Sequence, residues 1–292
     1  MTEVAPDPWQ RGVHALRCSV CAAPFPRPPT QVTPAGLLCT SGHRFDRARQ
    51  GYVALLSGRT RGHRSDTAPM VAARRRIQDA GIFDPVTAAV SSRLDPAADV
   101  IVDAGAGTGH YLSAALDTAP AALGIGCDLS KYCARAAARA HPRALSVVAD
   151  LWDTLPIASS AADAVLSIFA PRNLAETARI LAPGGRWLLV TPAPDHLAQV
   201  RESLGMLGIG ADKLERLHDE LADGGFAVAE TVPVTATAEL AAGQLADLAG
   251  MGPAGFHRTP DELAAAAQAL APGDVRVPVT VDVTLTVAVE RS

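Results

Sequence analysis

The chain has 292 residues, of which 48% are hydrophobic and 4% aromatic, and its formal net charge at pH 7 is −4. This length suits one large domain with a smaller one, and the composition is that of a globular protein. The sequence contains neither an apolar run of about 18 residues nor an apolar leader. This excludes a predicted membrane span and secretory signal, and we expect a cytoplasmic protein.

The charge is unevenly distributed along the chain. Residues 1–76 contain twelve arginines against four acidic residues, a balance of +8, so the rest of the chain carries −12. A basic segment joined to an acidic body favours an anionic partner for that segment, most often a nucleic acid. A charged surface that is simply solvated is the alternative.

The first part of the chain predicts a small module. Residues 1–15 are typical of an unstructured lead-in, and residues 16–56 are rich in turns and contain three of the five cysteines. Polar and basic residues at 57–69 predict a linker. We expect the other two cysteines, Cys127 and Cys133, to be small buried side chains, because disulfides are rare in the cytoplasm.

The cysteines of the module form a pattern with one histidine. Cys18 and Cys21 are separated by two residues, and 17 residues later Cys39 and His43 are separated by three. Three thiolates and one imidazole suit tetrahedral Zn²⁺, and four protein ligands leave no open position, so we predict a structural site. A redox Cys-x-x-Cys pair is the alternative, but no thioredoxin-like βαβ pattern surrounds it. A module this small would need the metal to fold.

A strip of arginines follows the cysteine–histidine pattern, opposed only by Asp46 and Asp66. Its members are Arg44, Arg47, Arg49, Arg59, Arg61, Arg64, Arg74, Arg75 and Arg76. Guanidinium groups bind phosphates bidentately and stack on bases, and we assign the first six to RNA binding. The last three are neighbours on a predicted helix, about 100° apart, so we expect one of them to face the cofactor or the domain interface.

Two aromatic residues lie among these arginines. Phe45 and Tyr52 could stack on unpaired bases, but we expect both to belong to the core of the small module. Helical patterns then cover residues 70–83 and continue after Pro85, with Asp66 or Thr67 as the cap of the first helix.

From residue 99 onward, strand patterns alternate with helix patterns. The strand patterns cover 99–107, 122–130, 144–152, 162–171 and 186–194. The helix patterns cover 110–119, 131–141 and 173–185, the last stopped by Pro-Gly-Gly. This alternation predicts an α/β fold with parallel strands joined by right-handed crossovers and helices on both faces of the sheet.

The C-terminal part has a different pattern. Valine or leucine occupies every odd position from Val275 to Val289, which predicts a strand with one buried face. We expect this strand to be antiparallel and to close the sheet, next to a strand over 225–235. Residues 238–271 predict helices, with an irregular break at 250–260.

A glycine-rich loop follows the first strand. Its sequence VDAGAGTGH places Asp103 two residues before Gly105, which is followed by Gly107 and Gly109. Glycines let a backbone turn sharply and approach a ligand closely. The spacing differs from the G-x-G-x-x-G of dinucleotide enzymes and is typical of class I, Rossmann-like methyltransferases, whose cofactor is S-adenosylmethionine. A nicotinamide or flavin enzyme and a non-catalytic fold are the alternatives.

Acidic residues at two further strand ends strengthen this interpretation. Asp128 ends the second strand, where a carboxylate can accept both ribose hydroxyls of a cofactor. Asp150 ends the third strand, where the adenine amine would lie in such a fold. The loop alone is a weak signal, and the loop with both acids is stronger.

Taken together, these segments resemble the RlmA-type 23S rRNA (guanine-N1)-methyltransferases, a family that includes macrolide-resistance enzymes. The likeness extends from about residue 16 to the C-terminus. It rests on separate blocks in a fixed order, among them CSVC, CTSGHRFDRARQGYVALL, SDTAPMVAARRRIQDAGIFDPV, DAGAGTGHYL, IFAPRN, RILAPGGRWLLVTPAPDHL and MGPAGFHRTP. The resemblance implies a zinc-binding RNA-recognition domain over 1–60, a basic linker with helices over 61–98 and a methyltransferase domain over 99–292.

The resemblance also implies specific residues and partners. The zinc ligands carry over to the four residues of the cysteine–histidine pattern. The cofactor residues carry over to Gly105, Gly107, Thr108, Gly109, Asp128, Phe83 and His196. Phe83 stands where the family often has tyrosine. The implied enzyme is a homodimer with an RNA-binding cleft, which methylates N1 of one guanine in a hairpin of the peptide exit tunnel.

The segment APRN after the fourth strand occupies the place where methyltransferases acting on amino groups carry an Asn/Asp-Pro-Pro-aromatic motif. Its absence agrees with a ring nitrogen as the target. We hypothesise that Arg172 or Asn173 contacts the base, with an ordinary loop role as the alternative. Two other functions stay open: a small-molecule methyltransferase of a biosynthetic pathway, and a zinc-dependent RNA-binding protein with a vestigial cofactor domain.

Overall fold

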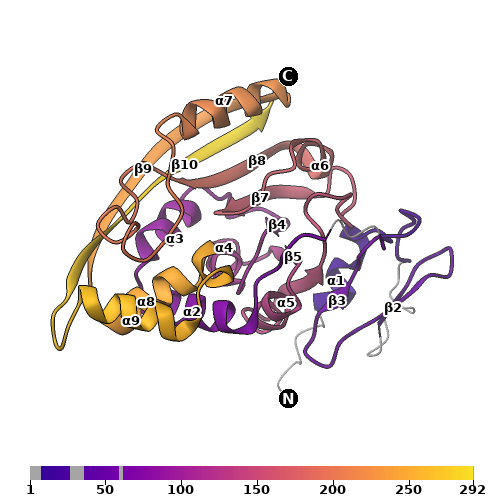
Figure 1. The fold of residues 1–292 in the computed structure, drawn as a ribbon. Helices are drawn as coiled ribbons and strands as arrows, with labels where there is room; N and C mark the ends of the chain where they lie inside the picture. Colours follow the sequence, from indigo (N-terminus) through magenta and orange to yellow (C-terminus); the bar gives the residue numbers. More distant parts are fainter. Residues whose placement is uncertain (1–7, 27–35, 59–61, 292) are drawn as a thin grey trace, which may run out of the picture.

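The computed structural model describes residues 8–26, 36–58 and 62–291. Within them, one eight-stranded sheet has the order β3-β6-β5-β4-β7-β8-β10-β9 (Figure 1). Its strands are β3 (Val53–Ala54), β4 (Val100–Ala104), β5 (Leu123–Asp128), β6 (Ala144–Val148), β7 (Ala162–Ile168), β8 (Leu181–Pro192), β9 (Phe226–Leu240) and β10 (Val277–Glu290). A small antiparallel pair consists of β1 (Gly36–Leu38) and β2 (Arg44–Asp46).

Helices cover both faces of the large sheet. They are α1 (Pro8–Gly12), α2 (Ala68–Asp79), α3 (Asp84–Ser91), α4 (His110–Thr118), α5 (Lys131–Ala137), α6 (Leu174–Ile180), α7 (Lys213–Asp223), α8 (Ala242–Gly250) and α9 (Pro260–Leu270). Short 3₁₀ turns cover Val13–Ala15 and Pro253–Phe256. Alternate residues of β4 face opposite cores: Ile101 belongs to one apolar cluster, and Val100 and Val102 to the other. Burial on both faces explains the unbroken apolar strand patterns.

The strand directions agree with those predicted from the sequence. Pairs from β3 through β8 are parallel, whereas β10 pairs antiparallel with both β8 and β9. The odd-numbered residues of β10 from Val279 to Val287 are buried in one cluster, as the period-2 pattern predicts. The α/β class and the closing antiparallel strand are therefore confirmed.

One helix ends earlier than the sequence analysis predicts. The helix over 173–185 stops at Ile180, and the chain enters β8 at Leu181. Ala182 precedes Pro183, and a residue before proline disfavours the helical conformation, so the helix ends before this pair. The Pro-Gly-Gly segment is instead an irregular part of β8, in which Gly184 has a φ of +79°. The register of β7 with β8 shifts between Ala162 and Ala164, which accommodates the irregular segment.

The N-terminal residues pack on the eight-stranded sheet and add a strand to it. Strand β3 pairs in parallel with β6, with Val53 opposite Val147. Trp9 is buried in the same apolar cluster as residues of β4, β5 and β6. Gly12 lies so close to Leu123 that a side chain at this position would collide with it. The N-terminal segment thus shares its core with the parallel sheet, and the part that carries β2 extends beyond the β3 edge (Figure 1).

This shared core predicts the effect of removing one ring. The variant Trp9→Ala is expected to lower the free energy of unfolding by about 3–5 kcal/mol, because it leaves a cavity under α1. Urea denaturation followed by circular dichroism measures the change. Val20→Ala is the control, because Val20 is 58% exposed, and it should change stability by less than about 0.5 kcal/mol. Equal stability of the two variants would contradict the shared core.

Candidate functional site

A cavity of about 480 Å³ lies at the carboxyl ends of the central parallel strands. Its walls come from the glycine loop after β4, from the ends of β5, β6 and β7, from α2 and from the turn after α8. In open α/β sheets this edge is where ligands bind, because the loops after successive strands meet there. The fold therefore brings together residues that are far apart in the chain, from His63 to Phe256.

The glycine loop requires residues without side chains. Gly105, Gly107 and Gly109 have φ values of +98°, +54° and +83°, in the region that favours glycine. A side chain at Gly105 would overlap Ala170, and one at Gly109 would lie 3.0 Å from the Cα atom of Ala137. The loop is thus shaped so that its backbone, rather than side chains, faces the cavity.

Asp128 connects the glycine loop with the next helix. Its Oδ2 atom accepts a hydrogen bond from Gly107 N at 2.9 Å, and its Oδ1 atom accepts one from Ser130 N at 2.7 Å. Burial raises the pKa of this carboxyl group, while the two N–H donors act in the opposite direction. Each oxygen keeps a second lone pair, so the carboxylate can still accept ligand hydroxyls.

Asp150 lies at the neighbouring strand end. It is buried at the wall of the cavity and accepts a hydrogen bond from Trp152 N at 3.0 Å. Trp152 itself is exposed and lies beside His63, with 6.2 Å between the ring centroids. The strand ends therefore present two carboxyl groups, with an aromatic ring close to the outer one.

Asp103 is buried behind the glycine loop. It is 1% exposed, does not line the cavity, and neither carboxyl oxygen has a hydrogen-bond partner among the described residues. Burial raises the pKa of Asp103 to about 7, and the charge of Asp128 adds to this effect. Such an orphaned carboxyl group fits a cationic ligand nearby, and S-adenosylmethionine carries both a sulfonium and an ammonium group.

One of the three adjacent arginines on α2 faces the cavity, as predicted. Arg74 forms an ion pair with Asp66 at 2.5 Å and donates a hydrogen bond to Met251 O at 2.8 Å. Its Nη1 atom lies 3.2 Å from the position that a side chain on Gly107 would occupy. Arg76 instead pairs with Asp247 on α8 at 2.5 Å. Arg74 thus ties α2 to the turn after α8 across the glycine loop.

Three aromatic rings form the rim of the cavity near β7 and β8. Phe83 and His196 are buried, with 6.3 Å between their ring centroids, and Phe169 is exposed. The Nδ1 atom of His196 accepts a hydrogen bond from Asp282 N at 3.2 Å, so the ring hydrogen is on Nε2. Burial lowers the pKa of His196 to about 4, and the imidazole is therefore neutral at physiological pH.

The predicted cofactor residues divide into two groups. Those that line the cavity are Phe83, Gly105, Gly107, Asp128, Asp150 and His196. Thr108, Gly109 and Asp103 lie behind them. The Oγ1 atom of Thr108 donates a hydrogen bond to Gln78 at 2.6 Å, and Gly109 is the N-cap residue that precedes α4. Thr108 and Gly109 thus fix the back of the loop, whereas the Asp103 carboxyl group is buried there without a partner among the described residues.

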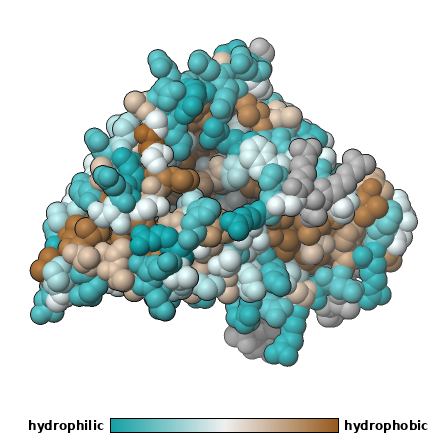
Figure 2. All heavy atoms as spheres, viewed as in Figure 1, coloured by the Kyte–Doolittle hydropathy of each residue, from teal (hydrophilic) through white to brown (hydrophobic). Residues whose placement is uncertain are grey.

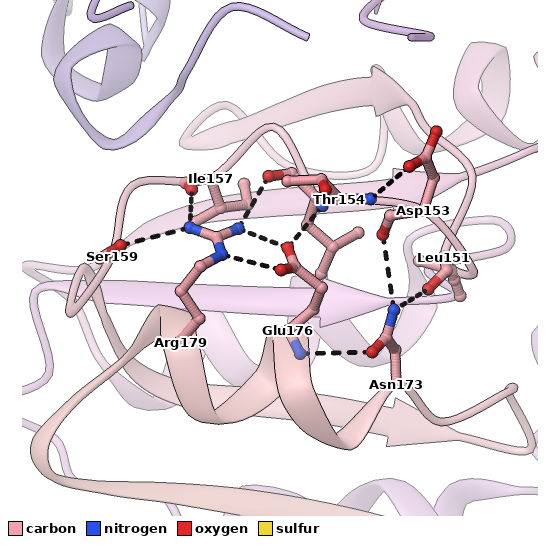
Figure 3. A network of polar contacts seen from close by, with 9 residues as sticks. Leu151, Asp153, Thr154, Ile157, Ser159, Asn173, Glu176 and Arg179 are labelled. Atoms are coloured by element: carbon pink, nitrogen blue, oxygen red, sulfur yellow. Dashed lines mark hydrogen bonds and ion pairs between the residues drawn. The ribbon is translucent and has the colours of Figure 1, made fainter. Parts of the chain in front are cut away.

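Arg172 and Asn173 make structural contacts and do not line the cavity. Arg172 pairs with Glu220 on α7 at 2.7 Å. The side chain of Asn173 caps α6 by accepting from Glu176 N at 3.3 Å and donates to Leu151 O at 3.0 Å (Figure 3). These contacts favour the alternative interpretation of both as loop residues, and a contact with the base stays a prediction.

The four residues of the cysteine–histidine pattern converge on one point. Their ligand atoms all lie within 4.8 Å of one another. His43 Nδ1 is 3.6 Å from the Cys18 sulfur and 3.5 Å from that of Cys39, and the sulfurs of Cys21 and Cys39 are 3.9 Å apart. Tetrahedral zinc with Zn–S distances of about 2.3 Å places its sulfur ligands about 3.8 Å apart. The donor set and its dimensions therefore fit zinc.

Backbone groups prepare the sulfurs for a metal. The Ala23 N–H is the main group that lowers the pKa of Cys21, to about 6. The His43 N–H donates to the Cys39 sulfur at 3.3 Å. Both interactions stabilise a thiolate, which is the form that binds metal.

The predicted RNA-binding arginines are placed at two sites. Arg44 and Arg49 are exposed near the cysteine–histidine cluster, in a region that we call the zinc-binding edge (residues 16–26 and 36–50). Arg47 lies over the Trp9 ring at 5.5 Å. Arg64 lines the cavity and lies 5.8 Å from the centre of the Phe256 ring. Arg59 and Arg61, like Arg27, fall outside the described residues. Phe45 is partly buried and packs edge-on against Phe25, as expected for a core residue of the module.

Sequence reasoning missed several residues of the cavity, including Trp152, Phe169 and Met251. The position of Phe169 directly after a predicted strand could have signalled it, since strand ends meet at this edge. The face in Figure 2 is mostly hydrophilic, with apolar side chains in separate groups. Among the described residues, no helix has the length and apolar character needed to cross a membrane.

The metal site predicts a selective loss of zinc. The variant Cys39→Ala is expected to be purified without bound zinc, because the three remaining ligands hold the metal poorly. It should also melt at a lower temperature, because the small N-terminal module depends on the metal to fold. Metal content by mass spectrometry and thermal unfolding measure these effects. Cys133→Ala is the matched control, since this buried cysteine is remote from the cluster in the sequence and should leave the zinc content unchanged. Normal zinc content in Cys39→Ala would contradict the assignment.

Comparisons with known proteins agree with this geometry. Two family models match the chain: one described as "RlmA, N-terminal", at residues 16–61, and one described as "Methyltransferase domain", at residues 101–185. The first contains all four proposed zinc ligands. The second contains the glycine loop and both strand-end acids.

The chain is also similar to three curated proteins. A 23S rRNA (guanine(748)-N(1))-methyltransferase of Streptomyces fradiae is 44% identical over 257 residues, 86% of this chain and 89% of that protein. A Micromonospora griseorubida protein, provisionally named for the same guanine-N1 reaction, is 40% identical over 87% of this chain and 91% of its own length. A similarly named Bacillus subtilis protein is 35% identical over 65% of this chain. The chain therefore belongs to the family of RlmA-type 23S rRNA (guanine-N1)-methyltransferases, as an S-adenosylmethionine-dependent methyltransferase with an N-terminal zinc ribbon.

Proposed function

We propose that this protein transfers the methyl group of S-adenosylmethionine to N1 of one guanine in 23S rRNA. The observation that carries the proposal is the 44% identity to a guanine-N1 methyltransferase over 86% of this chain. We further propose that the target lies in a hairpin of the peptide exit tunnel and that the modification confers macrolide resistance. The family resemblance supports both points, together with a homodimer that acts in the cytoplasm.

We assign each end of the cofactor to a part of the cavity. Asp128 would accept the ribose hydroxyls with its remaining lone pairs, and Asp150 would accept the adenine amine. Gly105 and Gly107 would let the methionine part approach the backbone. When bound, the cofactor supplies an electrophilic methyl group. The residues of the chain align this group with the guanine, and such alignment accounts for much of the rate in methyl transfer.

The rim near β8 supplies a fixed hydrogen-bond donor. Because Asp282 N–H occupies Nδ1 of His196, the Nε2–H group is available to an oxygen at this end of the cavity. Phe83 packs beside this imidazole and keeps the site apolar on that side. We assign both residues to the methionine end of the cofactor, where the methyl group would meet the base.

The arginines of the zinc-binding edge would bind the phosphates of the RNA. Arg44 and Arg49 are exposed there, and Arg64 extends the basic strip to the rim of the cavity. A route from the zinc ribbon to the cavity thus carries positive charge at both ends. A methyltransferase for small molecules would not need this strip.

The reaction is tested with methyl-labelled cofactor and naked 23S rRNA. Incorporation followed by nucleotide mapping should show 1-methylguanosine at a single position. Asp128→Asn is the control, and it should lose activity because the cofactor affinity falls. Label that appears only on small molecules, or on an exocyclic amine of the RNA, would contradict the proposed function.

The buried carboxyl group predicts a pH dependence of cofactor binding. Asp103 has a pKa of about 7 in the free protein, with Asp128, Tyr111 and Cys127 as its neighbours. A bound cation favours the ionised form of Asp103, so the affinity for S-adenosylmethionine should rise with pH. The rise should be at most about tenfold per pH unit below about pH 7, and the affinity should level off above it. Calorimetry between pH 6 and 8 measures this slope.

The variant Asp103→Asn serves as the control for this slope. Titration of the cofactor's own groups affects both proteins equally, but the variant has no carboxyl group at position 103. Its affinity for the cofactor should therefore depend much less on pH. The wild type should also release a proton on binding near neutral pH, which is detected as a dependence of the binding enthalpy on the buffer. Parallel slopes in both proteins would show that Asp103 does not sense the cofactor.

A further inference from the structure

Phe169 has an unusual backbone conformation for a large apolar residue. It follows β7 directly, has a φ of +55°, and is 42% exposed. Among the described residues other than glycine, only Ala22, Ser160 and Leu197 also have a positive φ. Large side chains rarely adopt this conformation, and it persists only where the surrounding structure enforces it.

The surrounding strands enforce this conformation. The Phe169 N–H donates to Val190 O on β8 at 3.1 Å, which fixes the backbone at the strand end. The next residue, Ala170, lies close to Gly105, where a side chain on the glycine would overlap the Ala170 Cβ atom. The strained turn directs the ring to the cavity rim instead of the core, where a phenylalanine would be more stable.

The ring lies against two buried partners. The centroids of Phe83 and His196 are each 5.8 Å from that of Phe169, at interplanar angles of 74° and 32°. Those two side chains are 3% and 8% exposed, so they form a fixed wall behind it. Leu197, beside His196, is another of the residues with positive φ. Phe169 is thus held from behind and has part of its surface exposed at the cavity.

The order of the strands places Phe169 at the reactive end of the cavity. The acids assigned to adenosine lie at the ends of β5 and β6, on one side of β4. Phe169 follows β7, on the other side of β4. An exposed ring at this side is far along the sheet from the adenine position, and it lies where the methyl group would meet its acceptor.

We propose that Phe169 is the platform on which the target guanine stacks after it leaves the RNA helix. This inference rests on the proposed function. An enzyme that modifies a ring atom must extrude the base from its stack, and an aromatic side chain replaces the lost stacking. A purine has a large π face that suits a partly exposed phenyl ring. The conformational strain at Phe169 is then part of the construction of the site.

The backbone conformation provides a sharp test. Phe169→Gly removes the ring and also relieves the strain at positive φ, which offsets part of the packing that is lost with the ring, so we expect this variant to stay folded. It should nevertheless lose about 10- to 100-fold in kcat/KM for 23S rRNA, because base–aromatic stacking has a strength of this order. Phe169→Leu should show a similar loss, and Phe169→Tyr should retain most of the activity.

Two further measurements separate this role from a cofactor role. Calorimetry with S-adenosylhomocysteine should give the same Kd for Phe169→Gly as for the wild type, whereas the matched variant Trp152→Leu, near Asp150, should weaken binding. In addition, 2-aminopurine replaces the mapped guanine in the RNA. Its fluorescence should be quenched by stacking on the wild type and should rise with Phe169→Gly.

The outcomes distinguish the two levels of the proposal. A wild type that forms no 1-methylguanosine in 23S rRNA overturns the proposed function itself. If the wild type is active and Phe169→Gly keeps its kcat/KM, the stacking role is wrong. A loss of cofactor affinity in Phe169→Gly would also overturn it, because the ring would then belong to the cofactor site.

Discussion

The cofactor cavity depends on the carboxylate of Asp128. Its two oxygens accept N–H groups from the glycine loop and from the start of the following helix, so one side chain fixes two walls of the cavity. Burial and this same charge raise the pKa of Asp103, and Arg74, which is paired with Asp66, offsets part of the charge of Asp128. The result is a rigid and acidic pocket, which favours a cationic ligand over an anionic one.

An acidic cavity is by itself poorly suited to binding RNA. Phosphates are repelled where the carboxyl groups gather, so positive charge has to be supplied elsewhere. The first 76 residues carry +8 and the remainder −12. Because Trp9 and β3 are built into the sheet, the basic zinc-binding edge has a fixed position relative to the cavity. Zinc then has no chemical role and serves to hold this edge in shape.

The sequence was sufficient where the signal is local, and it failed where distant segments meet. The spacing of Cys18 to His43, the glycine loop and the alternation in β10 each predicted the structure, because the pattern itself sets the geometry. The sequence did not predict the pairing of Val53 with Val147, since no local pattern selects a partner strand. It also could not show that Asn173 donates to Leu151 O, or that Phe169 has a strained backbone, because both depend on contacts between segments that are distant in the chain.

The central claim is that the cofactor and the phosphate backbone of the RNA are bound by separate, oppositely charged parts of one molecule, and that only the target guanine enters the cofactor cavity. The most direct measurement is parallel titration of S-adenosylhomocysteine and a 23S rRNA fragment against the protein before and after zinc removal by a chelator. The zinc-loaded protein should bind the RNA with an affinity that falls steeply with salt, and removal of zinc should abolish this binding. The affinity for S-adenosylhomocysteine should stay nearly constant. Equal loss of both affinities would contradict the claim, as would RNA binding that survives without zinc.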